Sequence, residues 1–181
     1  RIGGAWGAAA ERGPWRNTAE QCGGVLFEVS QHELDYMRCL LGDGKSVFAA
    51  MGQYIRTDTD YADLNYVLIN FQRGGIGCLL AGQAAELGSY DGKVLCEQGT
   101  IFFDNGKRLI TYRIRDNEPV VIDVSKREFE PGVQREVREF CEAVLSDGEV
   151  TIPGVEGLRN VEIAEAAVLS AQEGRLVELP L

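Results

Sequence analysis

The sequence predicts an α+β fold: an open-faced, largely antiparallel β-sheet with helices packed on one face. Three observations support this prediction. A segment with helical periodicity comes first, alternating segments with turn signals follow, and two more helical segments and a short apolar segment end the chain. The chain has 181 residues, of which 45% are hydrophobic, which is enough for one core. We therefore expect residues 1–181 to form a single domain.

Three segments are predicted to be helical. The first covers residues 24–41, where hydrophobic residues recur at helical spacing up to the stop signal GDG. The second begins after Pro131 and ends at Asp147-Gly148. The third covers about residues 155–173 and precedes a glycine suited to a helix C-terminus. The second helix is amphipathic. Its hydrophobic stripe consists of Val133, Val137, Phe140, Val144 and Leu145.

Strands are predicted between the first two helices. Residues 46–55 are short and apolar and lead into a polar loop, so they are predicted to be a strand. Residues 64–82 contain two apolar runs on either side of Gly74-Gly75, which predicts a hairpin. The sheet therefore begins directly after the first helix.

Residues 99–124 are predicted to form three more strands. Asn105-Gly106 is typical of a type I′ hairpin turn, and DNEP marks a second turn. The last strand is predicted in residues 175–181. The sheet face that the helices leave uncovered is rich in Tyr, Leu and Phe, so we expect it to be buried in a homo-oligomer.

The composition narrows the possible partners and location. Twenty-eight acidic and eighteen basic residues give a net charge of −10, and no segment concentrates Lys or Arg, so nucleic acid is not an expected partner. No apolar run reaches the roughly 18 residues that span a membrane, and no signal peptide is visible. The five cysteines are widely spaced without C-x-x-C, which indicates neither a disulfide framework nor a zinc site. We expect a soluble, cytoplasmic protein with buried or half-buried cysteines.

Three short motifs do not support a ligand site. The opening IGGAWGAAAERG lacks the spacing of G-x-G-x-x-G and a preceding strand, so it does not predict a dinucleotide site. The run RGGIGC at residues 73–78 is predicted to be a hairpin turn. DTDYAD at residues 58–63 lacks the glycine and the final glutamate of an EF-hand loop, so it is predicted to be a solvated loop. No metal site is expected.

His32 is the only histidine of the chain. On a continuous helix, Glu28 would lie one turn before it and Asp35 nearly one turn after it, away from the apolar face. A carboxylate at this spacing can orient an imidazole for proton transfer near neutral pH. The same spacing also suits an exposed helix face with a weak ion pair. Spacing alone favours this second interpretation.

Two long segments resemble the C-terminal domain of the Gfo/Idh/MocA oxidoreductases. The first is PWRNTAEQCGGVLFEVSQHELDYMRCLLG, which contains Trp-Arg, Gly-Gly, an acid-x-x-x-His-x-x-Asp motif and a Leu-Gly end. The second is EFCEAVLSDGEVTIPGVEGLRNVEIAEAAVLSAQEGRLVELP, with Ser-Ala, Gly-Arg and a final strand. The resemblance covers nearly the whole chain.

The resemblance implies a function for the domain. In that family an N-terminal Rossmann domain, absent from this chain, binds NAD or NADP, and the C-terminal sheet domain supplies the substrate site and the oligomer contact. His32 would exchange the proton of a sugar, polyol or related hydroxylated substrate while hydride moves to or from the nicotinamide. Glu28 would orient His32, and Trp15, Arg16 and Asp35 would contact the substrate. By itself the chain would be inactive.

Two departures from the family pattern leave an alternative open. The family usually has Asp where this chain has Glu28, and the Rossmann half with its lysine is missing from the sequence, which begins abruptly at Arg1. We expect a further segment to precede Arg1. The alternative is a non-catalytic binding or assembly module that uses the same sheet domain.

Overall fold

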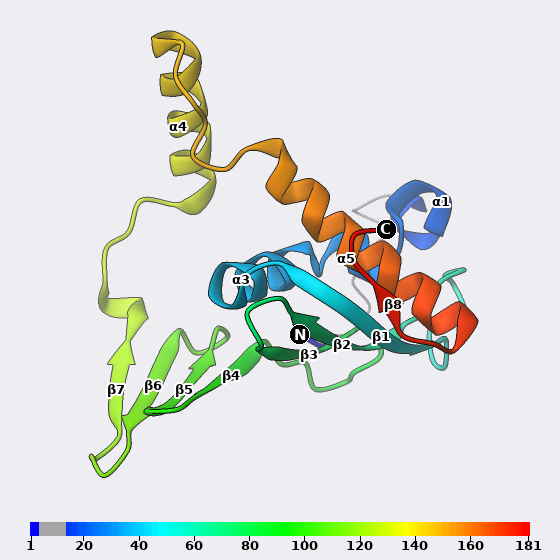
Figure 1. The fold of residues 1–181 in the computed structure, drawn as a ribbon, viewed down its shortest axis with the longest axis horizontal. Coiled ribbons are helices and arrows are strands. Elements are labelled where there is room, and N and C mark those ends of the chain that lie inside the picture. Colours follow the sequence, from blue (N-terminus) through cyan, green and yellow to red (C-terminus); the bar gives the residue numbers. More distant parts are fainter. Residues whose placement is uncertain (4–13) are drawn as a thin grey trace. The chain divides into compact units, whose positions relative to one another are not determined.

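The computed structural model describes residues 1–3 and 14–181, which divide into two compact units (Figure 1). Unit 1 comprises Arg1–Gly88 and Gly154–Leu181, and unit 2 comprises Ser89–Pro153. Each unit contains one four-stranded antiparallel sheet. The predicted α+β fold is therefore confirmed, with the strands shared between two sheets. That residues 1–181 act as a single domain stays a prediction.

Unit 1 holds most of the helices. The sheet has the strand order β3-β2-β1-β8, with every neighbouring pair antiparallel. Side chains alternate between a buried and an exposed face along β1 and β2, as expected for a sheet covered on one side. The elements of unit 1 are the 3-10 helix η2 (Pro14–Asn17), α1 (Ala19–Cys22), α2 (Val25–Glu28), α3 (Gln31–Leu41), β1 (Gly44–Gly52), β2 (Leu64–Phe71), β3 (Ile76–Gly82), α5 (Gly154–Glu173) and β8 (Val177–Glu178).

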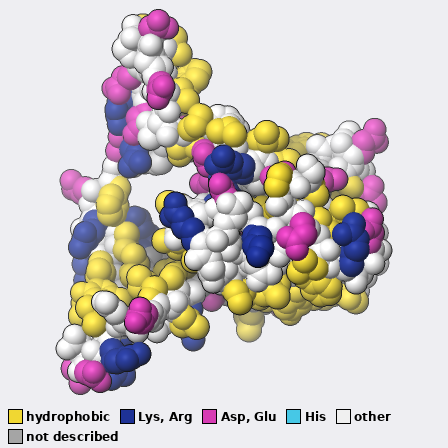
Figure 2. Space-filling view, in the orientation of Figure 1, with side chains coloured by type: hydrophobic (Ala, Val, Ile, Leu, Met, Phe, Trp, Pro, Cys, Tyr) yellow, Lys and Arg dark blue, Asp and Glu magenta, His cyan; other side chains and the backbone are white. Residues whose placement is uncertain are grey.

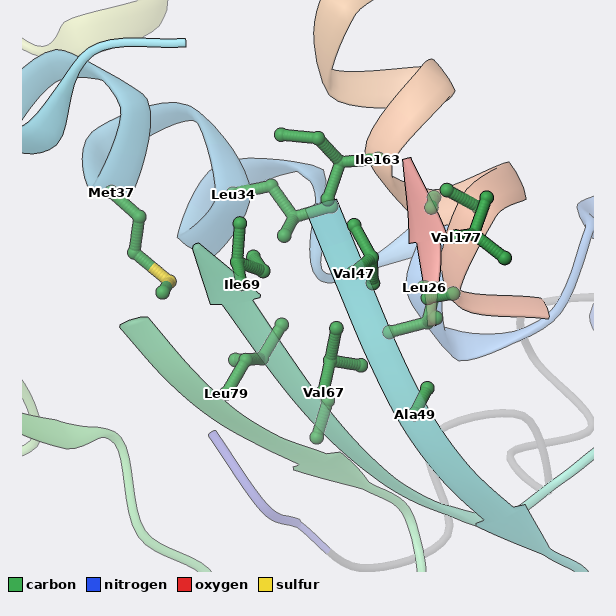
Figure 3. Packing of buried hydrophobic residues seen from close by; sticks show 14 of the residues in the cluster. Leu26, Leu34, Met37, Val47, Ala49, Val67, Ile69, Leu79, Ile163 and Val177 are labelled. Atoms are coloured by element: carbon green, nitrogen blue, oxygen red, sulfur yellow. The ribbon is translucent and has the colours of Figure 1, made fainter. Parts of the chain in front are cut away.

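The core of unit 1 lies between its sheet and helices α2, α3 and α5. Figure 3 shows Leu34 and Met37 of α3 and Ile163 of α5 on the side of the sheet that carries Val47 and Ile69. Small residues of α5, such as the buried Ala164 and Ala167, let this helix approach β1 closely. The core therefore fixes the position of the α2–α3 segment.

The predicted helix over residues 24–41 is wrong in one respect, because the structure breaks it between α2 and α3. The N–H groups of Val29 and Ser30 both donate to the carbonyl oxygen of Val25, and the next helix starts with Leu34 N–H donating to the carbonyl oxygen of Ser30. A β-branched residue followed by serine favours such a break. Glu28 and His32 thus lie on different helices.

Unit 2 contains β4 (Asp91–Cys96), β5 (Gly99–Asp104), β6 (Leu109–Ile114), β7 (Val120–Asp123), the 3-10 helix η3 (Val124–Lys126) and α4 (Gly132–Ser146). The three predicted strands of residues 99–124 are confirmed, and β4 was missed. The hairpin at Asn105-Gly106 exists, but the type I′ prediction is wrong. Its positive φ belongs to Arg108, whose N–H donates to the carbonyl oxygen of Asn105.

Helix α4 has the predicted bounds. It ends at Asp147, which adopts the left-handed conformation that often terminates a helix. The hydrophobic stripe of this helix is between 55% and 87% exposed, and Figure 2 shows hydrophobic side chains along one side of α4. The third predicted helix matches α5, with Gly174 at positive φ after it.

The predicted burial of the cysteines is wrong for four of the five. Cys22 is half-buried, whereas Cys39, Cys78, Cys96 and Cys141 are exposed, and all five are free thiols. Cys39 is on the outer side of α3 and Cys78 is on the uncovered face of β3. Each is exposed because its side of the helix or strand faces away from the core. No helix in residues 1–3 and 14–181 is long and apolar enough to cross a membrane.

Candidate active site

Two consecutive glycines place the α2–α3 segment. Gly23 and Gly24 both have positive φ, at 73° and 82°, a backbone conformation that residues other than glycine rarely adopt. A Cβ atom on Gly23 would come within 2.7 Å of Cβ of Phe27, and one on Gly24 would come within 3.3 Å of the Tyr61 ring. The Gly-Gly pair thus turns the chain sharply from α1 into α2.

Glu28 is held by Arg16. Nε and Nη2 of Arg16 lie 2.8 and 2.7 Å from Oε1 of Glu28. The guanidinium also stacks over the ring of Trp15, with 3.9 Å from Cζ to the ring centroid. The structure therefore brings together three of the predicted site residues, Trp15, Arg16 and Glu28, in a half-buried cluster.

Tyr61 supports this cluster and was not predicted from the sequence. Its hydroxyl donates a 2.6 Å hydrogen bond to the carbonyl oxygen of Arg16, and the thiol of Cys22 reaches the same oxygen at 3.6 Å. Burial raises the pKa of Tyr61, with a further contribution from Cys22. Tyr61 lies in the polar stretch DTDYAD, which was examined only as a possible calcium loop, so no signal in the sequence pointed to this contact.

His32 and Asp35 lie on the exposed side of α3, opposite the buried Leu34 and Met37. This confirms that the two share a polar face. His32 sits in the first turn of α3, and within residues 1–3 and 14–181 no hydrogen bond to its imidazole is found. The hydrogen bond of Glu28 goes to Arg16, so the predicted contact between Glu28 and His32 is not seen in the described part of the chain.

Asp35 is anchored by a residue of α5. Nδ2 of Asn160 on α5 donates to Oδ1 of Asp35 at 2.9 Å. This contact joins residues 125 positions apart in sequence, and nothing in the local pattern indicates it. Asp35 thus keeps its exposed position but has one oxygen already engaged.

Glu33, beside His32, is a buried carboxylate that was also not predicted from the sequence. Its side chain is 1% exposed, and Nη1 of Arg1 lies 3.7 Å from its Oε1. The sequence Ser30-x-x-Glu33 has the form of a capping box. The box does not form, because Ser30 N–H donates to the carbonyl oxygen of Val25 instead and α3 has no side-chain cap.

A cavity of about 340 Å³ opens beside the Gly-Gly turn. Its walls come from α1, α2, β1, α5 and the start of β2, and its polar groups include Tyr61, Asn65 and Gln172. His32 and Asp35 are not among its lining residues. The cavity therefore lies next to Tyr61, which supports the Arg16 cluster, and not next to the imidazole of His32.

The polar loop at residues 58–63 is only partly solvated. Asp58 and Asp60 are exposed, in agreement with the prediction, but Asp63 is fully buried and accepts hydrogen bonds from three backbone N–H groups. Among the residues that the structure describes, no group of three or more His, Cys, Asp or Glu residues could hold a metal ion.

No turn suited to a nicotinamide dinucleotide is found in residues 1–3 and 14–181. The glycines of residues 73–78 form the hairpin turn between β2 and β3 as predicted, which is not the strand-to-helix turn that binds a pyrophosphate. The opening glycine-rich segment lies mostly in residues 4–13, outside the described residues. No cofactor-binding residue is assigned to this chain.

The fold and the site define an α+β domain that presents one imidazole, an ion-paired glutamate and an arginine. Residues 4–179 match the family model described as "Oxidoreductase family, C-terminal alpha/beta domain". The chain belongs to the Gfo/Idh/MocA oxidoreductase family, to which the sequence resemblance pointed.

Known relatives and solved structures agree with this assignment. The chain is 25% identical to a D-apiose dehydrogenase of Rhizobium rhizogenes in an alignment of 173 residues, and the match covers 86% of this chain and 48% of that protein. A levoglucosan dehydrogenase in complex with NADH has a TM-score of 0.83 at 19% identity, over 99% of this chain and 56% of the other. An aldose-aldose oxidoreductase from Caulobacter crescentus, complexed with glycerol, has a TM-score of 0.82 at 17% identity, over 98% and 53%. The chain spans about half the length of these proteins.

Proposed function

We propose that this chain is the substrate-binding domain of an NAD(P)-dependent oxidoreductase that acts on a sugar, polyol or related hydroxylated compound, and that His32 is its catalytic residue. The observation that carries the proposal is the sole, exposed imidazole on α3, in a domain of an oxidoreductase family. Relatives named for apiose and levoglucosan support a carbohydrate substrate. The isolated chain would be inactive, because its described residues form no turn suited to the dinucleotide.

The chain's own residues supply the proton half of the reaction. Bound in another domain, the nicotinamide would exchange hydride with the substrate carbon. His32 would take the proton from the substrate hydroxyl in oxidation and return it in reduction, which an imidazole does efficiently near neutral pH. Trp15 and Arg16 would contact the substrate, and Asp35 would accept a hydrogen bond from it. Glu28 is paired with Arg16 in this structure, and we propose that it orients the imidazole in the complete enzyme.

A second candidate function rests on Glu28. Its side chain is longer by one methylene than that of the family's usual aspartate, and its carboxylate is paired with Arg16. If Glu28 serves only this ion pair, the domain is a non-catalytic binding or assembly module. The two candidates differ in whether the full-length protein turns over a substrate.

The test is a turnover assay with the full-length protein that contains this chain. We expect at least one of D-apiose, levoglucosan and glycerol to support the formation of NADH or NADPH, which is measured as an increase in absorbance. The isolated chain should show neither turnover nor binding of NADH by fluorescence. A full-length protein that binds NADH but turns over none of a broad panel of sugars and polyols would favour the non-catalytic module.

We also propose that the uncovered sheet face of unit 1 forms a homo-oligomer contact. Phe48, Tyr66, Leu68 and Ile76 are all exposed, and Phe48 is paired with Leu68 across β1 and β2. Such a contiguous apolar face on a sheet is typical of a protein interface.

Replacing Leu68 with Asp should therefore convert the oligomer into monomers in light scattering after gel filtration. Thr57→Asp, in an exposed loop, is the matched control and should leave the mass unchanged. A parent protein that is monomeric would contradict the proposal.

A further inference from the structure

A buried amide joins two charged side chains at the interface of α3 and α5. Asn160 is 5% exposed. Its Nδ2 donates to Oδ1 of Asp35, and its Oδ1 accepts a 2.9 Å hydrogen bond from Nη1 of Arg38. Arg38, 6% exposed, donates further to Oδ1 of Asp43 and Oε2 of Glu156 at 2.8 and 2.6 Å. The amide therefore connects the exposed face of α3 to a dense ion-pair cluster.

The chemistry of the partners fixes the orientation of the Asn160 amide. A guanidinium can only donate, and an ionised carboxylate can only accept. The oxygen of Asn160 must therefore face Arg38 and its nitrogen must face Asp35. An aspartate at this position would turn a like charge toward Asp35, and a leucine would remove the hydrogen bonds that Asn160 makes with both Arg38 and Asp35.

The contacts around Arg38 favour the charged forms of Arg38 and Asp43. Burial would lower the pKa of Arg38, but its hydrogen bonds and ion pairs with Asp43 and Glu156 outweigh this and raise it. The hydrogen bond from Arg38 is the main cause that lowers the pKa of Asp43. Arg159 adds contacts to Asp43 and Glu156 at the rim. The side-chain oxygen of Asn160 is thus held by a guanidinium that is itself fixed in place.

We propose that Asn160 is a positioning residue of the substrate site, which fixes the carboxylate of Asp35 so that its second oxygen can accept a hydrogen bond from the substrate. The inference rests on the proposed function, since it assigns a role to the same α3 face. It goes beyond that function because it places a determinant of substrate binding on α5, 125 residues away in the chain. A hydrogen bond from the amide also fixes the rotation of the Asp35 side chain, which is otherwise free on an exposed helix face.

The test compares variants of the full-length protein with the substrate that the parent turns over best among D-apiose, levoglucosan and glycerol. Asn160→Asp keeps the size and the contact with Arg38 but loses the donor to Asp35. We expect KM to rise about tenfold or more, in line with the loss of a hydrogen bond to a charged group, with a smaller change in kcat. Arg159→Gln is the matched control, because it removes rim ion pairs of the same helix without contacting Asp35. Its KM should remain that of the parent.

A second variant separates positioning from folding. The double variant Asp35→Asn with Asn160→Asp exchanges donor and acceptor, so the hydrogen bond between the two positions can re-form. We expect the thermal midpoint to return toward that of the parent while KM stays high, because the carboxylate then lies on the wrong helix. A KM near the parent value in either Asn160→Asp or the double variant would overturn the inference while leaving the proposed function intact. A parent that turns over no substrate would overturn both.

Discussion

Replacing His32 with alanine is expected to lower kcat/KM of the full-length enzyme by about 10²- to 10⁴-fold, the usual contribution of a general acid–base group. The reason is that hydride transfer at a carbinol carbon requires removal of the hydroxyl proton in the same reaction. His32 is the only imidazole in the 181 residues, so the chain offers no second group of this kind. Steady-state kinetics with the best substrate measures the effect.

The position of His32 makes this experiment easy to interpret. The side chain is exposed, and in the described residues it accepts or donates no hydrogen bond, so its removal should leave the thermal midpoint nearly unchanged. Cys39→Ala, two turns further along the same helix and also exposed, is the control and should keep parental activity. Parental activity in His32→Ala would eliminate the proposed catalytic role and favour the non-catalytic module.

Replacing Asp63 with asparagine is expected to destabilise unit 1 strongly. The buried carboxylate accepts hydrogen bonds of 3.1, 2.7 and 2.7 Å from the N–H groups of Tyr54, Ile55 and Arg56. An asparagine would turn its NH₂ group toward one of these donors. We expect a loss of about 2 to 3 kcal/mol in the free energy of unfolding, measured by denaturant titration. Asp116→Asn, at a surface turn, removes the same charge and should change stability little.

The effect of Asp63 should depend on pH with a defined sign. Burial by itself would raise the pKa of Asp63, but the backbone donors led by Arg56 outweigh it and hold the pKa below its ordinary value. A lowered folded-state pKa stabilises the fold above the unfolded pKa of about 3.9. This stability is lost as the pH falls through the folded pKa. The difference between parent and Asp63→Asn should therefore be largest near neutral pH and shrink below about pH 4. A difference that grows in acid would contradict this account.

Much of the architecture could be predicted because its signals are local. Helix α4 stops where Asp147-Gly148 predicts, and the hairpin of β2 and β3 turns at Gly74, where a positive φ is required. The break between α2 and α3 could not be predicted, because the hydrophobic periodicity of residues 24–41 continues through it. Strand β4 was not predicted because polar and apolar residues alternate only weakly along it.

The candidate site was predicted in its residues but not in its contacts. Trp15, Arg16 and Glu28 do lie together, yet Glu28 contacts Arg16 rather than His32 in the described structure. Tyr61 lies 45 residues from Arg16, whose carbonyl oxygen it binds. Periodicity can place a side chain on a face of a helix, but it cannot say which distant group that side chain meets.

The sequence by itself determined where most helices and strands form, which family the domain resembles, and that only one imidazole is available for proton transfer. These features follow from spacing and residue type within a few turns of chain. Only the tertiary structure decided that Asp63 is buried, that Glu28 is paired with Arg16, and that Asn160 holds Asp35. The physical reason is that burial and hydrogen-bond partners arise where segments far apart in sequence pack together. Helices α3 and α5 are in contact although seven strands separate them in the chain.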